Sequence, residues 1–256
     1  MSPSTVVQTA DHGGVRVLTM NRPEARNALS TELFEALHAG LIAADTDESV
    51  HAVVLTGTDP AFCAGVDLKQ AQQLGREYFA RFAAHDCMAA IADMTTPIVG
   101  AVNGATFTGG LEIALACDFL IASQRAVFAD THARVGILPG GGMTARLPQV
   151  VGTAMARRLS MTGEVLDAER AERIGLVTEV VAHEQLLARA LELAGQIAEV
   201  PAATMSALKQ MYRRGSATVT GPALAAEREI SAATPMSTEN LAQRQREVAE
   251  RNKRQL

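Results

Sequence analysis

The stretch TPIVGAVNGATFTGGLEIALACDF, residues 96–119, decides the fold of this chain. It opens with an apolar run over residues 98–102, which predicts a buried strand. The strand breaks at Asn103, and the chain then passes through Gly109 and Gly110 into an apolar helix. A buried strand that leads through glycines into a helix is typical of an α/β fold, and we expect this passage to lie at its centre.

Glycines at this passage have two physical consequences. They allow positive φ angles, and they let a ligand approach backbone N–H groups where a helix dipole begins. Such a corner binds anions, or an oxygen on which negative charge develops. Glu112 follows Gly109 by three residues, so its side chain stacks over the preceding turn and faces whatever the amides hold. The alternative is a packing turn beside a surface glutamate, and this stretch alone leaves both interpretations open.

The length and composition describe a globular protein. The 256 residues suffice for one large domain or for a domain with an appendage, and no apolar run is long enough to cross a bilayer. The N-terminus lacks the basic start and apolar block of a secretory signal. Cys63, Cys87 and Cys117 are odd in number and form no C-x-x-C pair, so we expect neither a disulfide framework nor a zinc site. These features favour a cytoplasmic protein without membrane association.

Charge and glycine motifs exclude several function classes. The net charge is −5 and the 23 Lys and Arg residues are scattered, so no nucleic-acid partner is expected. A second glycine-rich turn, residues 135–142, lacks the ending of a P-loop, and no G-x-G-x-x-G follows a strand. Nucleotide hydrolysis and dinucleotide redox chemistry are poor fits, and we expect no cofactor and no metal. Arg22 and Arg26 follow the first predicted strand, where they either meet a phosphate or are solvated.

Hydrophobic periodicity predicts the order of elements. Residues 15–20 are expected to form the first strand, and Ser30 to cap the N-terminus of the helix that follows. A nearly continuous apolar run over 50–56 predicts a strand covered on both faces, followed by a long loop over 57–67. We further expect helical character over 79–94, strands over 120–123 and 126–129, a loop that carries His132, and mostly helices from residue 152 onward.

Two regions are expected. Residues 1–198 form the core, and residues 199–256 form a C-terminal helical region that follows a break near Pro201. A short helical appendage cannot bury its own apolar residues, such as Leu208 and Met211. They should therefore pack on the core or on another subunit.

Four separated blocks of the sequence resemble the enoyl-CoA hydratase/isomerase (crotonase) superfamily. They occur in the order and spacing of that family over nearly the whole chain, and the likeness is weaker in the last helices. The blocks are NRPEARNAL (21–29), AFCAGVDL (61–68), the stretch from Asn103 to Glu112 with Asp118, and GILPGGG (136–142).

The resemblance implies a fold, a substrate and a site. The fold would be an α/β, crotonase-like spiral of ββα units whose C-terminal helices build a homotrimer or a dimer of trimers. The substrate would be an acyl thioester of coenzyme A. The two oxyanion-hole amides fall on Val66 and Gly109, and Glu112 matches a catalytic glutamate. The implied substrate-binding residues are Arg26, Ala28, Ala64, Asp67, Leu68 and Gly110.

His132 is the main departure from the family pattern, because hydratases have a second glutamate there. Three interpretations are open. His132 takes over acid/base work, since an unperturbed histidine pKa of about 6.5 lies near working pH. It leaves Glu112 as the only carboxylate, for a proton shift or another step through the same enolate. Or it is a loop histidine without a chemical part. Asp130 and Arg134 are near enough in sequence to tune it.

We therefore expect an enzyme that adds water to a 2-enoyl-CoA thioester. The reaction passes through an enolate, and two preorganised N–H groups stabilise its charge more than they stabilise the neutral substrate. An isomerase or a thioester hydrolase of the same superfamily would use the same oxyanion hole. A hypothesis of a different class, motivated by His132, is an acyl-CoA-binding protein that has lost efficient catalysis.

Overall fold

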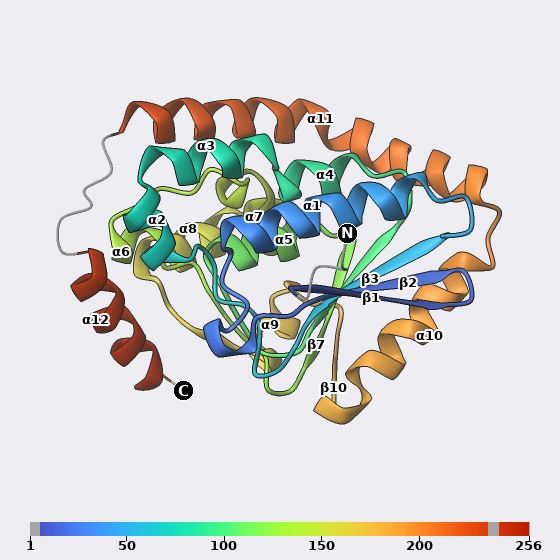
Figure 1. Cartoon of the computed structure of the whole chain (residues 1–256), viewed down its shortest axis with the longest axis horizontal. Coiled ribbons are helices and arrows are strands. Elements are labelled where there is room, and N and C mark those ends of the chain that lie inside the picture. Colours follow the sequence, from blue (N-terminus) through green and yellow to red (C-terminus); the bar gives the residue numbers. More distant parts are fainter. Residues whose placement is uncertain (1–5, 235–240, 256) are drawn as a thin grey trace.

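Two sheets form the frame of the computed structural model, which describes residues 6–234 and 241–255 (Figure 1). The larger sheet has the strand order β1-β2-β3-β5-β7-β10, and the smaller has the order β4-β6-β8-β9. The strands are β1 (Val7–His12), β2 (Val15–Met20), β3 (Ala52–Gly57), β4 (Ala61–Cys63), β5 (Ile98–Val102), β6 (Ala105–Phe107), β7 (Phe119–Ser123), β8 (Val127–Ala129), β9 (Leu166–Asp167) and β10 (Glu179–Val181).

From β3 to β8, successive strands alternate between the two sheets. β3, β5 and β7 lie parallel in the larger sheet, and β4, β6 and β8 lie parallel in the smaller one. Each pair of strands is followed by a helix, α2 after β4, α5 after β6 and α6 after β8. The chain therefore repeats a strand–strand–helix unit, which confirms the expected α/β spiral of ββα units.

Helices cover both faces of the larger sheet. The helices are α1 (Thr31–Thr46), α2 (Leu68–Leu74), α3 (Arg76–Ala84), α4 (Cys87–Asp93), α5 (Gly109–Ala116), α6 (His132–Val135), α7 (Met143–Val151), α8 (Thr153–Thr162), α9 (Ala168–Arg173), α10 (Leu186–Ala198), α11 (Ala202–Ala233) and α12 (Leu241–Lys253). In β3, Ala52 and Val54 join the apolar cluster under α10, whereas Val53 and Leu55 join the larger core that includes α1. Burial on both sides explains why β3 reads as a continuous apolar run.

Two predicted strands and one predicted helix cap are confirmed. β2 and β5 have the predicted bounds, 15–20 and 98–102. Ser30 caps α1, because its Oγ accepts the Leu33 N–H at 3.2 Å. The three cysteines are buried and unpaired. Within the described ranges, no helix is both long and apolar enough to cross a membrane.

Other local predictions are wrong. β2 is the second strand, because β1 precedes it with mostly exposed side chains that leave no apolar pattern. The expected loop over 57–67 contains β4, whose three residues are too few to show periodicity. The helical segment over 79–94 is split, since Asp86 accepts the Ala89 N–H at 2.9 Å and starts α4 as a new helix. His132 is not in a loop but is the first residue of α6.

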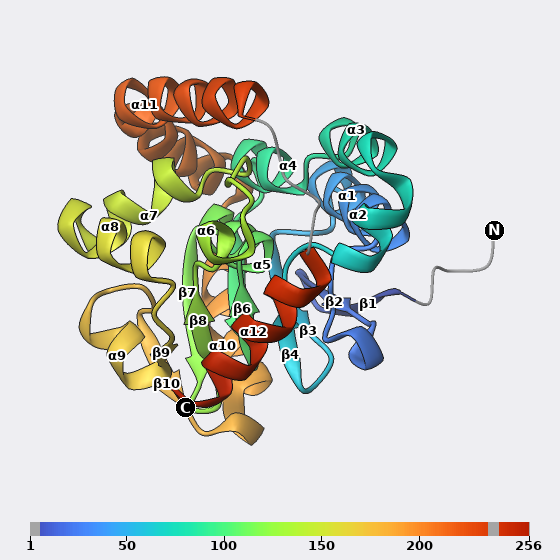
Figure 2. The ribbon, with the colours of Figure 1, turned by 90° about the vertical axis from the view of Figure 1, so that its left-hand side faces the viewer.

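The last two helices leave the spiral. α11 starts after Pro201 and lies along the upper edge of Figure 1, and it packs on α7. Leu208 and Met211 on α11 remain 45% and 69% exposed in the single chain. In Figure 2, α12 crosses in front of the smaller sheet, and it packs on α6 and α2. The C-terminal helix α12 therefore lies against the two helices that follow β4 and β8.

Candidate active site

A strained backbone corner precedes α5. Thr108, the residue before Gly109, has φ 49° and ψ −118°, a region that β-branched residues rarely adopt. Its N–H donates to the Ala129 carbonyl at 3.1 Å, which ties the corner to the end of β8. Gly65 has φ 91°, and a Cβ there would overlap Thr108 Oγ1. Only a glycine at position 65 therefore lets the two loops approach so closely.

This contact brings the peptide units of Val66 and Gly109 together. A Cβ added at Gly109 would lie 3.8 Å from the Val66 nitrogen. Leu29 bridges the residues on either side of Val66, because its N–H donates to Gly65 at 2.8 Å and its carbonyl accepts from Asp67 at 3.3 Å. Neither the Val66 nor the Gly109 N–H has an acceptor within residues 6–234 and 241–255. Two neighbouring N–H donors are thus left for another group.

Glu112 lies one helical turn beyond this corner and is buried, with 4% of its surface exposed. The interpretation of Glu112 as a surface residue is therefore wrong. Its Oε1 accepts the N–H of Gly141 at 2.8 Å and that of Met143 at 3.3 Å. Its Oε2 lies 3.7 Å from Nε2 of His132. The carboxylate is held on one oxygen and faces a histidine with the other.

His132 is equally buried, and Asp130 fixes its ring. Nδ1 of His132 and Oδ1 of Asp130 are 2.8 Å apart, and the same oxygen accepts the His132 backbone N–H at 3.2 Å. A carboxylate at Nδ1 keeps a proton there and leaves Nε2 as the nitrogen that faces Glu112. The structure therefore places His132, Glu112 and Asp130 in one buried group.

The surroundings shift the pKa of each member of this group. Burial raises the pKa of the Glu112 carboxyl, and the charge of Glu227 adds to the rise, although the His132 charge opposes it. For His132, burial acts to lower the pKa, but the hydrogen bond to Asp130 and the charge of Glu112 raise it overall. The pKa of Asp130 is lowered despite its burial, because His132 donates to it. A carboxyl with a raised pKa beside a readily protonated imidazole suits acid/base chemistry near neutral pH.

A pocket of about 580 Å³ opens next to this group. Its wall includes Val66, Thr108, which precedes Gly109, and Thr131, which precedes His132. The expected substrate-binding residues that line it are Arg26, Ala28, Ala64, Asp67 and Leu68. The structure therefore gathers five separate predictions at one cavity.

Two of the predicted substrate-binding residues, Asp67 and Gly110, have structural roles. Asp67 caps α2 by accepting the Gln70 N–H at 3.2 Å, and it pairs with Arg22 at 3.2 Å. Gly110 does not line the pocket, and a Cβ there would overlap the Cys63 carbonyl oxygen. Its glycine is required for the packing of α5 on β4, and its substrate-binding role stays a prediction.

Sequence reasoning missed the contribution of α12 to the pocket. Val248, Ala249, Asn252 and Lys253 complete the wall. They lie in a polar, charged tail without a motif, so no local signal pointed to them. Arg251 attaches the helix to the core, because it donates to the Gly163 carbonyl at 2.7 Å.

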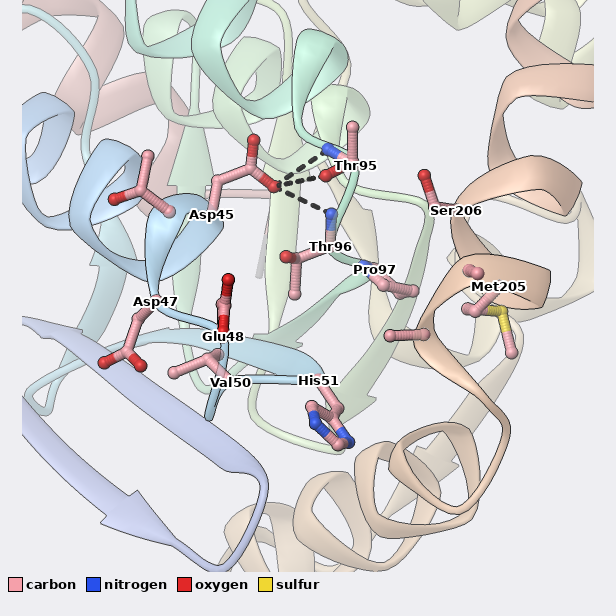
Figure 3. A pocket seen from close by; sticks show the side chains of 13 residues that line it. Asp45, Asp47, Glu48, Val50, His51, Thr95, Thr96, Pro97, Met205 and Ser206 are labelled. Atoms are coloured by element: carbon pink, nitrogen blue, oxygen red, sulfur yellow. Dashed lines mark hydrogen bonds between the residues drawn. The ribbon is translucent and has the colours of Figure 1, made fainter.

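A second pocket, of about 320 Å³, lies away from these groups between the end of α1 and the start of α11 (Figure 3). Asp45 lines it, and it accepts the Thr95 N–H at 2.9 Å and the Thr96 N–H at 2.8 Å. These bonds occupy Asp45 in fixing the loop before β5. Within the described ranges, no group of three or more His, Cys, Asp or Glu side chains is arranged to hold a metal ion.

Comparison with known proteins shows the family of this chain. The sequence pattern of the family described as enoyl-CoA hydratase/isomerase matches residues 10–255. The chain belongs to the enoyl-CoA hydratase/isomerase family. A member from Rhizobium meliloti, named probable enoyl-CoA hydratase, is 43% identical over 198 residues, which cover 76% of each chain.

Solved structures of the enoyl-CoA hydratase/isomerase family show the same fold. A crystal structure of an enoyl-CoA hydratase from Mycobacterium smegmatis has a TM-score of 0.79 and 48% identity, and the match covers 88% of this chain and 96% of that one. A monofunctional enoyl-CoA isomerase from the same organism has a TM-score of 0.72 and 30% identity, with 83% and 94% covered. The chain is thus an enzyme of a family whose members include both hydratases and isomerases.

Proposed function

We propose that this enzyme hydrates a 2-enoyl-CoA thioester, with Glu112 and His132 as its acid/base pair. The observation that carries the proposal is the placement of two buried, facing acid/base groups beside two N–H donors without acceptors. The neighbouring pocket supports a coenzyme A thioester as substrate. Its lining includes Val66 and Thr108, beside the two N–H donors, and also the cations Arg26 and Lys253, which could bind phosphates. Coenzyme A is part of this substrate and not a separate cofactor.

The proposed reaction uses each group for one step. The thioester carbonyl oxygen accepts from the N–H groups of Val66 and Gly109, which stabilise the negative charge that develops on it. Glu112 takes a proton from water while the water oxygen bonds to carbon 3, and the electron pair of the double bond moves into the enolate. His132 then donates a proton to carbon 2. Proton exchange with solvent returns Glu112 and His132 to their starting forms.

The separation of the two acid/base groups supports this division of work. At 3.7 Å, Nε2 of His132 and Oε2 of Glu112 are too far apart for a strong direct hydrogen bond, so each retains capacity for a substrate atom. Asp130 stabilises the protonated imidazole through its bond to Nδ1. His132 in its charged form is therefore available to donate a proton.

The substitution Glu112→Gln tests the proposal. Gln keeps the size of the side chain and one hydrogen-bond acceptor but is not a base, so hydration should fall on the order of 10²–10⁴-fold. The assay follows the loss of the enone-thioester absorbance over a panel of chain lengths. Circular dichroism and CoA binding serve as controls and should be unchanged. Unaltered turnover in this variant would remove Glu112 from the mechanism.

Isomerisation is the second candidate reaction. A double-bond shift needs one base to move a proton along the substrate, and the Glu112 carboxylate, which faces His132 across the site, could serve as that base. Offering 3-enoyl-CoA thioesters in the same panel separates the two reactions. If neither substrate turns over but acyl-CoA binds tightly, and His132→Glu gains hydration, the protein is a binding protein with impaired catalysis.

We further propose a homotrimer or a dimer of trimers located in the cytoplasm. The assembly is supported by large side chains on α11 that one chain leaves uncovered, namely Leu208, Met211, Tyr212, Val219 and Ile230. Apolar surface of this extent on one helix is typical of a subunit contact. Light scattering on the eluted protein measures the mass, and a monomer at micromolar concentration would contradict the proposal.

A further inference from the structure

The start of α7 is held by two carboxylates from distant parts of the chain. Its successive backbone N–H groups bind them alternately. Those of Gly141 and Met143 donate to Glu112, at 2.8 and 3.3 Å, and those of Gly142 and Thr144 donate to Glu227, at 2.6 and 2.7 Å. Glu112 comes from α5 and Glu227 from α11. The turn over residues 141–144 therefore connects Glu112 to α11.

Glu227 is a buried carboxylate that sequence reasoning did not identify. It is 7% exposed and also accepts the Thr144 hydroxyl at 2.5 Å. It forms no ion pair within the part of the chain that the structure describes, so backbone N–H groups and one hydroxyl satisfy it. A buried acid with such partners is bound by the positive end of the α7 dipole.

The turn depends on this arrangement because it cannot cap itself. Gly142, at the N-cap of α7, has φ 107° and no side chain that could accept the orphan N–H groups of the first turn. Glu112 and Glu227 replace the missing cap from outside. Without Glu227, the N–H groups of Gly142 and Thr144 lose their acceptor. The turn can then shift, and the N–H groups of Gly141 and Met143 move away from Glu112.

We propose that Glu227 is a positioning residue of the active site. It fixes the turn over residues 141–144 so that Gly141 and Met143 hold the Glu112 carboxylate opposite His132. The geometry of the catalytic base then depends on the docking of α11. This inference rests on the proposed role of Glu112.

Kinetics of Glu227→Gln are the first test. The amide has only one acceptor and cannot bind both Gly142 and Thr144, so the turn loosens and kcat should fall roughly 10- to 100-fold, as a displacement of about 1 Å allows. KM should stay the same, because neither α7 nor α11 lines the pocket. The control is Arg228→Gln on the same helix. Arg228 pairs with Asp86 at 2.8 Å and forms no hydrogen bond with residues 141–144 in the described part of the chain, so kcat should be unchanged.

Site-resolved amide hydrogen exchange is the second test, and it requires no turnover. In Glu227→Gln we expect faster exchange at Gly141 and Met143, whose acceptor is Glu112, as well as at Gly142 and Thr144. A residue that merely caps α7 would affect only the latter two. That result, or a kcat equal to wild type at a temperature where the variant is folded, overturns the inference. If the wild type lacks hydration activity, the proposed function fails, and the exchange result still decides the role of Glu227.

Discussion

Two histidines of this chain each lie between two polar side chains, but they are placed in different surroundings. His183 joins Ser123 and Asp59, since Nδ1 is 2.9 Å from the Ser123 Oγ and Nε2 is 2.9 Å from Asp59. Judged by residue type alone, Ser123, His183 and Asp59 resemble the nucleophile, base and acid of a hydrolase. His132, by contrast, lies between two carboxylates, those of Asp130 and Glu112.

Access and free hydrogen-bonding capacity distinguish the two groups. Ser123 is completely buried at the end of β7, its Oγ also accepts the Arg125 N–H at 3.0 Å, and it does not line either pocket. Both ring nitrogens of His183 are occupied. His132 uses only Nδ1 in a hydrogen bond, and the residue before it lines the 580 Å³ pocket. The comparison shows that a group of suitable side chains can act as a site only where one of its atoms is still free to bind a substrate and lies next to a cavity.

The largest expected difference follows from replacing each histidine by glutamine. His132→Gln removes the group that donates a proton to the substrate, and it should reduce kcat on the order of 10²–10⁴-fold. His183→Gln should leave kcat within about twofold, because His183 does not line the 580 Å³ pocket and its hydrogen bond to Asp59 is exposed. Steady-state hydration assays at one pH measure both. A similar loss in the two variants would break the distinction between them.

An intermediate effect is expected from Asp130→Asn. Asp130 holds the pKa of His132 above its ordinary value, and loss of this charge-assisted bond should lower that pKa. The protonated imidazole is the active form, so activity is present below its pKa and is lost as the pH rises through it. The alkaline limb of the kcat/KM profile should therefore move to lower pH. Asp59→Asn, the matched change at His183, should leave the profile in place.

The smallest effect is expected from Ser123→Ala. The variant removes a hydrogen bond to His183 and should lower the free energy of unfolding by about 1 kcal/mol, with unchanged hydration kinetics. Urea titration measures the first quantity and the spectrophotometric assay the second. A loss of turnover greater than the loss of folded protein would assign the Ser123 group to the active site after all.

The fold was predictable where the signal is local. The bounds of β2 and β5 and the Ser30 cap follow from apolar runs and from a hydrogen bond between residues three apart. β1 was missed because an exposed edge strand needs no apolar alternation, and β4 because three residues show no period. Periodicity reports burial, and it is silent where an element is exposed or very short.

The site was predictable in part. The glycine corner and Glu112 could be read from one stretch, and the four-block resemblance added Val66, which the structure brings next to Gly109. The orientation of His132 toward Glu112 required coordinates, because Asp130 sets it through a side-chain bond whose direction sequence does not give.

The sequence by itself determined the bounds of β2 and β5, where α1 begins, and which residue types carry the chemistry, because these depend on neighbours within a few residues. The tertiary structure alone decided that Glu227, 115 residues beyond Glu112, shares a turn with it, and that α12 completes the pocket. Such contacts carry no local pattern, because they result from the packing of the whole chain and not from any one stretch of it.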